Sequence, residues 1–367
     1  MEKIESTYSL KRGGKVTIRL CSADVFVRGT DEDQVRVIMI KHRPESSIPL
    51  IEASEKELII RSGSKTTEEI HKEADRGLGQ SLWETIWDAV SSSLKEVGIS
   101  LSLEFDQRIK DEVDLEIDLP RGLILDLFTV SGDLSAQDWE GELYFRSASG
   151  DCRLRNIKGQ AKTRTSSGDV RVESFEGPLS VSTTSGDVEI EEVKGDLKCE
   201  TLSGDLELGK IKGNGNFSLI SGDLHLEEIE GQLQASTTSG DLQVRALNAA
   251  SLKLSTVSGD LSLTLIPVSG GKYELHTTSG DISLRVPESA RLEIKVATIS
   301  GSFFSNLPLT SEQVSEETLN KVKGAGPIWL EKDWIRIGHK FTAVLNARDA
   351  VLEIKTVSGD INLRSLS

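Results

Sequence analysis

Residues 185–202 read SGDVEIEEVKGDLKCETL, and residues 203–220 read SGDLELGKIKGNGNFSLI. The two segments have equal length and begin with the same Ser-Gly-Asp tripeptide. This tripeptide recurs along much of the chain, with its serine at positions 131, 149, 167, 185, 203, 221, 239, 258 and 279. A degenerate copy begins at Ser300, and a full copy returns at Ser358. A fixed period over many copies indicates a solenoid, in which each repeat stacks on the next.

Apolar and polar residues alternate within each 18-residue period, as in a β-strand with one buried face. With the serine as position one, positions four, six and nine are almost purely apolar, for example Leu206, Leu208 and Ile211. Position eleven is glycine in six successive periods, where we expect a turn with positive φ. Positions thirteen, fifteen and seventeen then alternate inward again. The sequence therefore predicts an all-β fold, a parallel β-solenoid with coils of about 18 residues.

Two other solenoids with this period do not fit. A hexapeptide helix needs an apolar residue every six positions, but position ten is charged in six successive periods, from Glu140 to Glu230. The calcium-binding nonapeptide roll needs Gly-Gly-x-Gly-x-Asp in both turns, and the glycine turn lacks it. We expect about ten coils from Ser131 to Ser300, connected in the right-handed sense. At about 4.8 Å per coil they form a rod section of roughly 43 Å.

The pattern divides the chain into five segments and adds two short helical insertions to the solenoid. Residues 1–62 form an opening β segment, 63–98 a helical insertion, 99–303 the repeat solenoid, 304–350 a second insertion and 351–367 the final strands. The first insertion is predicted to contain a helix over residues 81–98, which has helical apolar spacing and ends at Gly98, and the second a helix over residues 311–323, which is stopped by Gly324. We expect the insertions to cap the open ends of the rod. The alternative is a surface for a partner or a membrane, with these tryptophans of the insertions as the candidate interface: Trp83, Trp87, Trp329 and Trp334.

The amino-acid composition indicates which partners the protein is not expected to bind and in which cell compartment it is expected. The chain contains 43 Lys and Arg residues against 59 Asp and Glu residues, a formal charge of −16. No run of basic residues offsets this charge, so nucleic acid and anionic membranes are not expected as partners. No apolar stretch is long enough for a transmembrane segment or a signal peptide, and three distant cysteines imply no disulfide framework. We therefore expect a cytoplasmic protein. Association of this protein with the cell envelope is compatible with that location.

The aspartates of the repeat are the main candidates for chemistry. We expect each to accept a backbone N–H within its own turn. A calcium ladder between neighbouring carboxylates is the alternative, formed by Asp133, Asp151, Asp169, Asp187, Asp205, Asp223, Asp241, Asp260 and Asp281. An inward threonine column is predicted to form a hydroxyl ladder between coils: Thr165, Thr183, Thr201 and Thr237. Cys152 and Cys199 occupy core columns, so we expect them to be buried rather than reactive.

No motif for catalysis stands out from the repeat. The chain has no Gly-x-Ser-x-Gly elbow, phosphate-binding loop or His-Glu-x-x-His helix, and its five histidines lie at no metal-ligand spacing. We therefore expect no catalytic residue, no cofactor and no dedicated metal site. A polysaccharide-cleaving β-helix enzyme remains a weaker alternative, since an aspartate ladder brings carboxylates together by accident.

The copies Thr129 to Leu134, Thr256 to Leu261 and Thr356 to Ile361, with the lead-in Leu119 to Gly122, resemble a known bacterial family. This is the "putative adhesin" family of unknown function, whose domains contain Ser-Gly-Asp strand repeats and some of whose members are associated with envelope stress. The resemblance implies a β-solenoid, no established enzymatic activity and no catalytic residues. We expect a non-enzymatic binding or scaffold protein whose partner is a protein or a cell-envelope component. The alternative is a self-assembling structural protein, in which the partner is a second copy of the chain.

Overall fold

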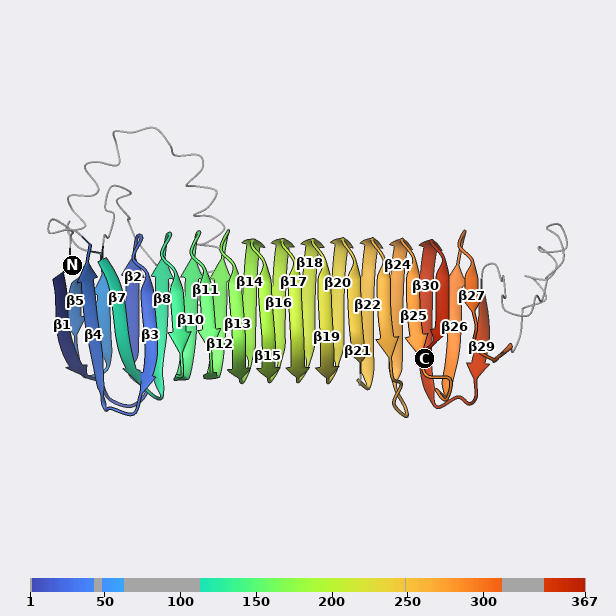
Figure 1. The fold of residues 1–367 in the computed structure, drawn as a ribbon, viewed down its shortest axis with the longest axis horizontal. Helices are drawn as coiled ribbons and strands as arrows, with labels where there is room; N and C mark the ends of the chain where they lie inside the picture. Colours follow the sequence, from blue (N-terminus) through green and yellow to red (C-terminus); the bar gives the residue numbers. More distant parts are fainter. Residues whose placement is uncertain (1, 43–47, 63–112, 248, 312–339, 367) are drawn as a thin grey trace, which may run out of the picture.

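In the computed structural model, the chain forms a straight rod made of stacked β-coils (Figure 1). The structure describes residues 2–42, 48–62, 113–247, 249–311 and 340–366. All 31 regular elements within these ranges are strands. None of the described segments forms a helix long and apolar enough to cross a membrane.

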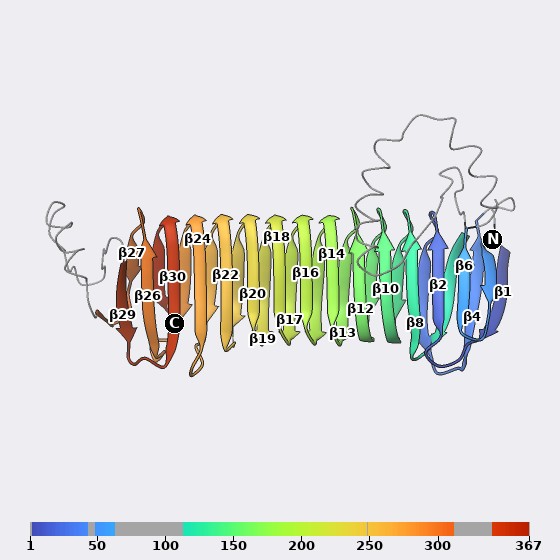
Figure 2. The ribbon, with the colours of Figure 1, turned by 180° about the vertical axis from the view of Figure 1, so that it is seen from behind.

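Each coil contributes one strand to each of two broad faces, which Figures 1 and 2 show from opposite sides. The first face contains the strands that follow the Ser-Gly-Asp turns. Its strands, in spatial order, are β1 (Glu2–Ser9), β4 (Gln34–Lys41), β7 (Val113–Pro120), β3 (Val25–Thr30), β9 (Leu134–Gln137), β11 (Cys152–Arg155), β13 (Val170–Glu176), β15 (Val188–Lys194), β17 (Leu206–Lys212), β19 (Leu224–Glu230), β21 (Leu242–Leu247), β23 (Leu261–Leu265), β25 (Ile282–Val286), β31 (Ile361–Ser365) and β27 (Phe303–Ser305).

The second face contains the strands that lead back to the Ser-Gly-Asp turns. In spatial order they are β5 (Leu50–Ala53), β6 (Glu57–Arg61), β2 (Lys15–Leu20), β8 (Leu123–Thr129), β10 (Glu140–Ser147), β12 (Ile157–Thr165), β14 (Leu179–Ser185), β16 (Leu197–Ser203), β18 (Gly215–Ser221), β20 (Leu233–Ser239), β22 (Ser251–Ser258), β24 (Lys272–Ser279), β30 (Ala350–Ser358), β26 (Leu292–Thr298), β29 (Lys340–Leu345) and β28 (Leu309–Ser311).

The inward columns of the sequence form the core between the two faces. Leu206 pairs with Val188 on one side and Leu224 on the other, in parallel register, and all three side chains are buried. This confirms the predicted parallel β-solenoid. The glycine turn has the predicted positive φ, between +119° and +158°, from Gly159 to Gly231, whereas Gly141 at the start of the column does not.

Near each end of the rod, a pair of strands is inserted between coils that are distant from it in the sequence. The last coil, β30 and β31, pairs with β24 and β25 on one side and with β26 and β27 on the other. The C-terminus therefore lies short of the end of the rod (Figure 1). At the other end, β2 and β3 lie between β6 and β7 on one side and β8 and β9 on the other.

This arrangement corrects the coil order read from the sequence, in which the copy at Ser300 stacks directly on the copy at Ser279. The copy at Ser358 lies between them instead, because Thr356 is in register with both Thr277 and Thr298. Coils with matching columns can stack in any order, and sequence proximity does not select among them. The section from Ser131 to Ser300 therefore gains one step of about 4.8 Å.

The outermost strands of the described chain are mostly antiparallel. β4 and β1 cover β7, β5 covers β6, and β29 and β28 cover β26. Reversing the strand direction ends the parallel stacking of coils at these edges. The predicted helices and the tryptophans Trp83, Trp87, Trp329 and Trp334 lie outside the described residues, so their capping and interface roles stay predictions.

Candidate functional site

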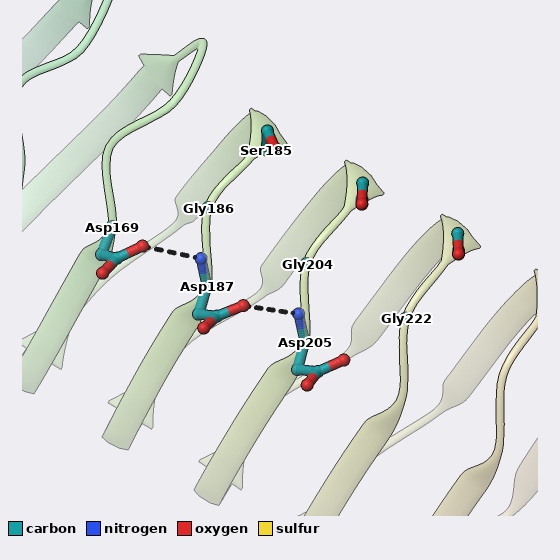
Figure 3. Close-up of a pocket in the computed structure, with 9 residues that line it drawn as sticks. Asp169, Ser185, Gly186, Asp187, Gly204, Asp205 and Gly222 are labelled. Carbon is teal, nitrogen blue, oxygen red and sulfur yellow. Dashed lines mark hydrogen bonds between the residues drawn. The ribbon is translucent and has the colours of Figure 1, made fainter.

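The Ser-Gly-Asp turns stack along one long edge of the rod and form a shallow groove of about 450 Å³ there. Figure 3 shows serine hydroxyls on one side of this groove, aspartate carboxylates on the other and glycine backbone between them. The groove is lined by Asp169, Ser185, Gly186, Asp187, Ser203, Gly204, Asp205, Ser221 and Gly222.

The aspartates of this edge hold neighbouring coils together. Oδ1 of Asp187 accepts the backbone N–H of Asp205 in the next coil at 2.9 Å (Figure 3). Equivalent bonds of 2.7 to 2.9 Å run from Asp24 through the column to Asp360, whose carboxylate accepts the N–H of Ser302. The prediction that each carboxylate bonds within its own turn is wrong. A parallel coil about 4.8 Å away brings the next N–H within reach.

Each carboxylate accepts a backbone N–H with one of its two oxygens. This leaves fewer lone pairs free to coordinate a cation. Burial raises the pKa of Asp133, as do the charges of Asp151 and Asp24, while a hydrogen bond from the Asp151 backbone opposes this. Within the described ranges, no three acidic, histidine or cysteine side chains converge in a group that could hold a metal ion. The calcium ladder of the sequence analysis therefore stays a prediction.

The turns themselves are of two kinds, which distinguish an N-terminal region of the rod from a central one, and the first kind returns at Gly301, whose N–H donates to Thr298 Oγ1. In the N-terminal region (residues 123–176), the glycine N–H donates to a side-chain hydroxyl of its own turn, as Gly168 does to Thr165 Oγ1 at 2.9 Å. In the central region (residues 197–286), Gly204 donates instead to the backbone carbonyl of Ser221 in the next coil at 3.2 Å. In Figure 1, arrowheads reach this edge on β16 to β24, whereas pointed turns follow β8 to β12.

The second kind of turn leaves threonine hydroxyls without a donor. Thr201 and Thr237 occupy the column of Thr165, but their Oγ1 atoms are buried and have no hydrogen-bond partner among the described residues. Thr183 Oγ1 is likewise buried without a partner among the described residues, and Thr165 Oγ1 bonds the backbone of Gly168 and Gly150, so the predicted hydroxyl ladder is wrong. In the central turns the glycine N–H donates to the next coil instead of to the threonine hydroxyl.

A row of aliphatic side chains is exposed beside the central turns. Because the strand continues through the serine, the residue before the serine points into solvent. Leu202, Ile220, Val257 and Val357 are 46%, 53%, 50% and 43% exposed. We call these four residues the aliphatic row. Large exposed apolar side chains that recur along one line of a surface are typical of interaction sites.

The outer side of the first face is highly charged, and its charges pair with one another across coils. Lys158, at the start of β12 where this strand pairs with β13, lies 3.0 Å from Glu176, and Lys210 lies 2.8 Å from Glu228. Arg171 pairs with Glu189 in the same way. These cross-coil pairs reduce the charge that this face offers to a partner.

The second face contains a buried ion cluster in the N-terminal part of the rod. The Asp126 carboxylate bonds Lys15 at 2.8 Å, Arg19 at 2.9 Å and Arg146 at 2.7 Å. Burial by itself would raise the pKa of Asp126, but hydrogen bonds and charges from the three basic groups outweigh it and hold the pKa well below the ordinary value. Sequence reasoning looked for runs of basic residues and missed this cluster, whose members lie far apart in the chain.

The remaining chemistry-bearing residues are dispersed. Cys152 and Cys199 are fully buried as predicted, and burial raises the pKa of both thiols well above the ordinary value. His42 lies 2.7 Å from Asp114 in an exposed pair. Burial and the Lys355 charge lower the pKa of His276, whose Nε2 has no hydrogen-bond partner within the described chain.

The chain belongs to the Toastrack DUF4097 family, whose model matches residues 14–220 and 178–327. No protein of curated function matches it. Among solved structures, a "putative adhesin" of Bacteroides fragilis is 13% identical, with 73% of this chain and 97% of that chain covered and a TM-score of 0.36. A "putative cell adhesion protein" of Clostridium sporogenes is 9% identical, with full coverage of both chains and a TM-score of 0.16. A "putative lipid binding protein" of Parabacteroides distasonis is 10% identical, with 100% and 97% coverage and a TM-score of 0.32.

Proposed function

We propose that this chain is a non-enzymatic, adhesin-like binding or scaffold protein that holds a cell-envelope component along its solenoid surface. The aliphatic row is the observation that supports this proposal most directly. It places Leu202 and Ile220 on adjacent coils, each about half exposed, beside the serine groove. Burying this row against a partner removes apolar surface from water at several coils at once.

The non-enzymatic part of the proposal rests on how the polar groups are used. The ladder aspartates each give one carboxylate oxygen to a neighbouring coil. The thiols of Cys152 and Cys199 are buried and have raised pKa values, which disfavours the thiolate needed for nucleophilic attack. The histidine His42 pairs with Asp114 on an exposed surface rather than in a cleft.

Co-sedimentation with isolated bacterial envelopes tests the proposal. The purified chain should pellet with envelopes and stay in the supernatant without them. The double variant Leu202→Ser with Ile220→Ser should pellet about tenfold less, because it removes the two members of the aliphatic row that lie on adjacent coils. Glu207→Gln, on the opposite face, is the matched control and should behave as the wild type.

Two outcomes contradict the proposal. Equal amounts of the chain in the supernatant with and without envelopes would rule out envelope binding. Pelleting in the control without envelopes would instead indicate self-assembly. As part of the same proposal we place the chain in the cytoplasm in association with the envelope, and separation of cells into soluble and membrane fractions tests this location.

A further inference from the structure

The outward side chains of the second face become uncharged in the middle of the rod. Across β18 and β20, its outward side chains carry no charge, although the protein as a whole has a formal charge of −16. We call this surface, together with its neighbours on β16 and β22, the amide face: Leu202, Asn216, Ser218, Ile220, Gln234, Ser236, Thr238, Ser255 and Val257. The first face of the same coils carries Glu207 and Lys210 on β17 and Glu227, Glu228 and Glu230 on β19.

The polar groups of the amide face are available to a partner. The side chains of Asn216, Ser218, Gln234 and Ser236 make no hydrogen bond to any other described residue, in contrast to the paired charges of the first face. Asn216 lies in register with Gln234, and Ser218 with Ser236. Donors and acceptors therefore repeat along the rod at about 4.8 Å.

Charges at the borders of the amide face are already paired. Lys198 lies 2.6 Å from Glu200 on β16, and Lys253 lies 3.9 Å from Glu274 across β22 and β24. A charged partner laid on this surface would lose water without gaining a free counter-charge, and this loss disfavours its binding. An uncharged partner rich in hydroxyl groups avoids this cost.

We propose that the amide face binds an uncharged polysaccharide chain lying along the rod, an inference that rests on the proposed envelope-binding function and names its ligand class. Sugar hydroxyls both donate and accept, so they can satisfy the NH₂ and the C=O of each amide as well as the serine hydroxyls. The aliphatic row lies beside these groups and packs against the apolar C–H surface of the sugar rings. The face from Leu202 to Val257 covers three coil steps, roughly 14 Å of polymer.

Affinity electrophoresis tests the inference, with hydroxyethylcellulose, dextran and laminarin as uncharged probes and carboxymethylcellulose as the anionic probe. The wild type should be retarded by at least one uncharged polymer, and the added carboxylates of carboxymethylcellulose should give no further retardation. The double variant Asn216→Asp with Gln234→Glu keeps the side-chain shapes and adds two charges. It should lose at least fivefold in apparent affinity. Gln243→Glu makes the same change on the first face and should bind as the wild type.

A thermal melt of each variant separates lost binding from lost folding. If the double variant melts like the wild type and still binds, or if Gln243→Glu weakens binding equally, the amide face is not the binding surface. Absence of retardation in all three uncharged polymers, or retardation by carboxymethylcellulose alone, would overturn the inference. Should that occur while the protein still pellets with envelopes, the proposed function stands and only the ligand class is wrong.

Discussion

The N-terminal and central regions of the rod have the same coil and different edges. Both stack an aspartate ladder on parallel strands and bury the same aliphatic columns. In the N-terminal region the glycine N–H bonds a hydroxyl within the turn, and the side chains before the serine, Val130 and Ala148, are half-buried. In the central region the glycine N–H bonds the next coil, and Leu202 and Ile220 project into solvent.

This difference distinguishes the inward side chains, which maintain the fold, from the outward side chains, which vary along the rod. The shared columns specify stacking, because each coil buries its apolar side chains only against its neighbours. The outward columns are free to differ without disturbing the stack. On the second face they form the buried Asp126 cluster in one region and the uncharged amide face in the other.

The largest effect is expected from a substitution in the buried aliphatic columns, which both regions share. Leu206→Asp places a carboxylate in a fully buried column, and we expect it to unfold or insolubilise the rod, with a loss of more than about 4 kcal/mol. Glu207→Lys, which points outward one residue later, should be tolerated. Thermal melts compare the two variants, and equal melting temperatures would show that the column assignment is wrong.

The next prediction tests how closely the coils approach at the turns. A Cβ on Gly204 would lie 2.2 Å from the carbonyl oxygen of Gly186, and one on Gly150 would lie 2.0 Å from that of Gly132. Backbone atoms cannot yield as a flexible side chain does, so Gly204→Ala and Gly150→Ala should each destabilise the rod by about 3 kcal/mol. Urea unfolding measures this loss, with Ser203→Ala as the tolerated control. If only one variant were destabilised, the two kinds of turn would differ in coil spacing as well as in hydrogen bonding.

A smaller effect belongs to the N-terminal region alone. Asp126→Asn removes the charge that pairs with Lys15, Arg19 and Arg146, and should cost about 2 kcal/mol at neutral pH. The folded-state pKa of Asp126 lies below its unfolded value, so its contribution is present above the unfolded pKa and is lost as pH falls. The difference in unfolding free energy between wild type and variant should therefore shrink below about pH 4.

If the difference in unfolding free energy between wild type and Asp126→Asn stayed constant with pH, the stabilising role of the ion cluster would be contradicted. Asp205→Asn provides a matched control, since the amide oxygen still accepts the N–H of Asp223 and the site holds no cluster of basic groups. Its effect on stability should be smaller and should vary less with pH. Chemical denaturation at pH 7, 5 and 3 measures both variants.

The smallest expected effect distinguishes the two kinds of turn most sharply. Thr165→Val leaves the Gly168 N–H without its acceptor and should cost about 1 kcal/mol. Thr201→Val removes a buried hydroxyl that has no partner among the described residues, and should be neutral or slightly stabilising. Equal losses in the two variants would mean that the central turns use the hydroxyl as the N-terminal ones do.

Much of this architecture follows from the repeat alone. The alternation of Leu206, Glu207 and Leu208 predicted which side chains are buried, and the glycine column predicted the positive φ of the second turn. The hydrogen bonds of the turns could not be predicted from a single repeat, because they depend on the neighbouring coil. The partner of Asp187 lies 18 residues away, and the threonine at position seventeen is followed by two different turns that begin with the same tripeptide.

The sequence by itself determined the coil, because a strict period of apolar, glycine and aspartate positions permits one stacked arrangement of parallel strands. Only the tertiary structure decided the order of the coils at the ends, since any two coils with matching columns can pair. There, β30 and β31 lie between β24 and β25 on one side and β26 and β27 on the other. The tertiary structure also decided which outward residues become neighbours. Stacking brings Asn216 beside Gln234, and it gathers Lys15, Arg19 and Arg146 around Asp126 from distant parts of the chain. A surface made of residues separated by a whole coil or more exists only once the coils are stacked.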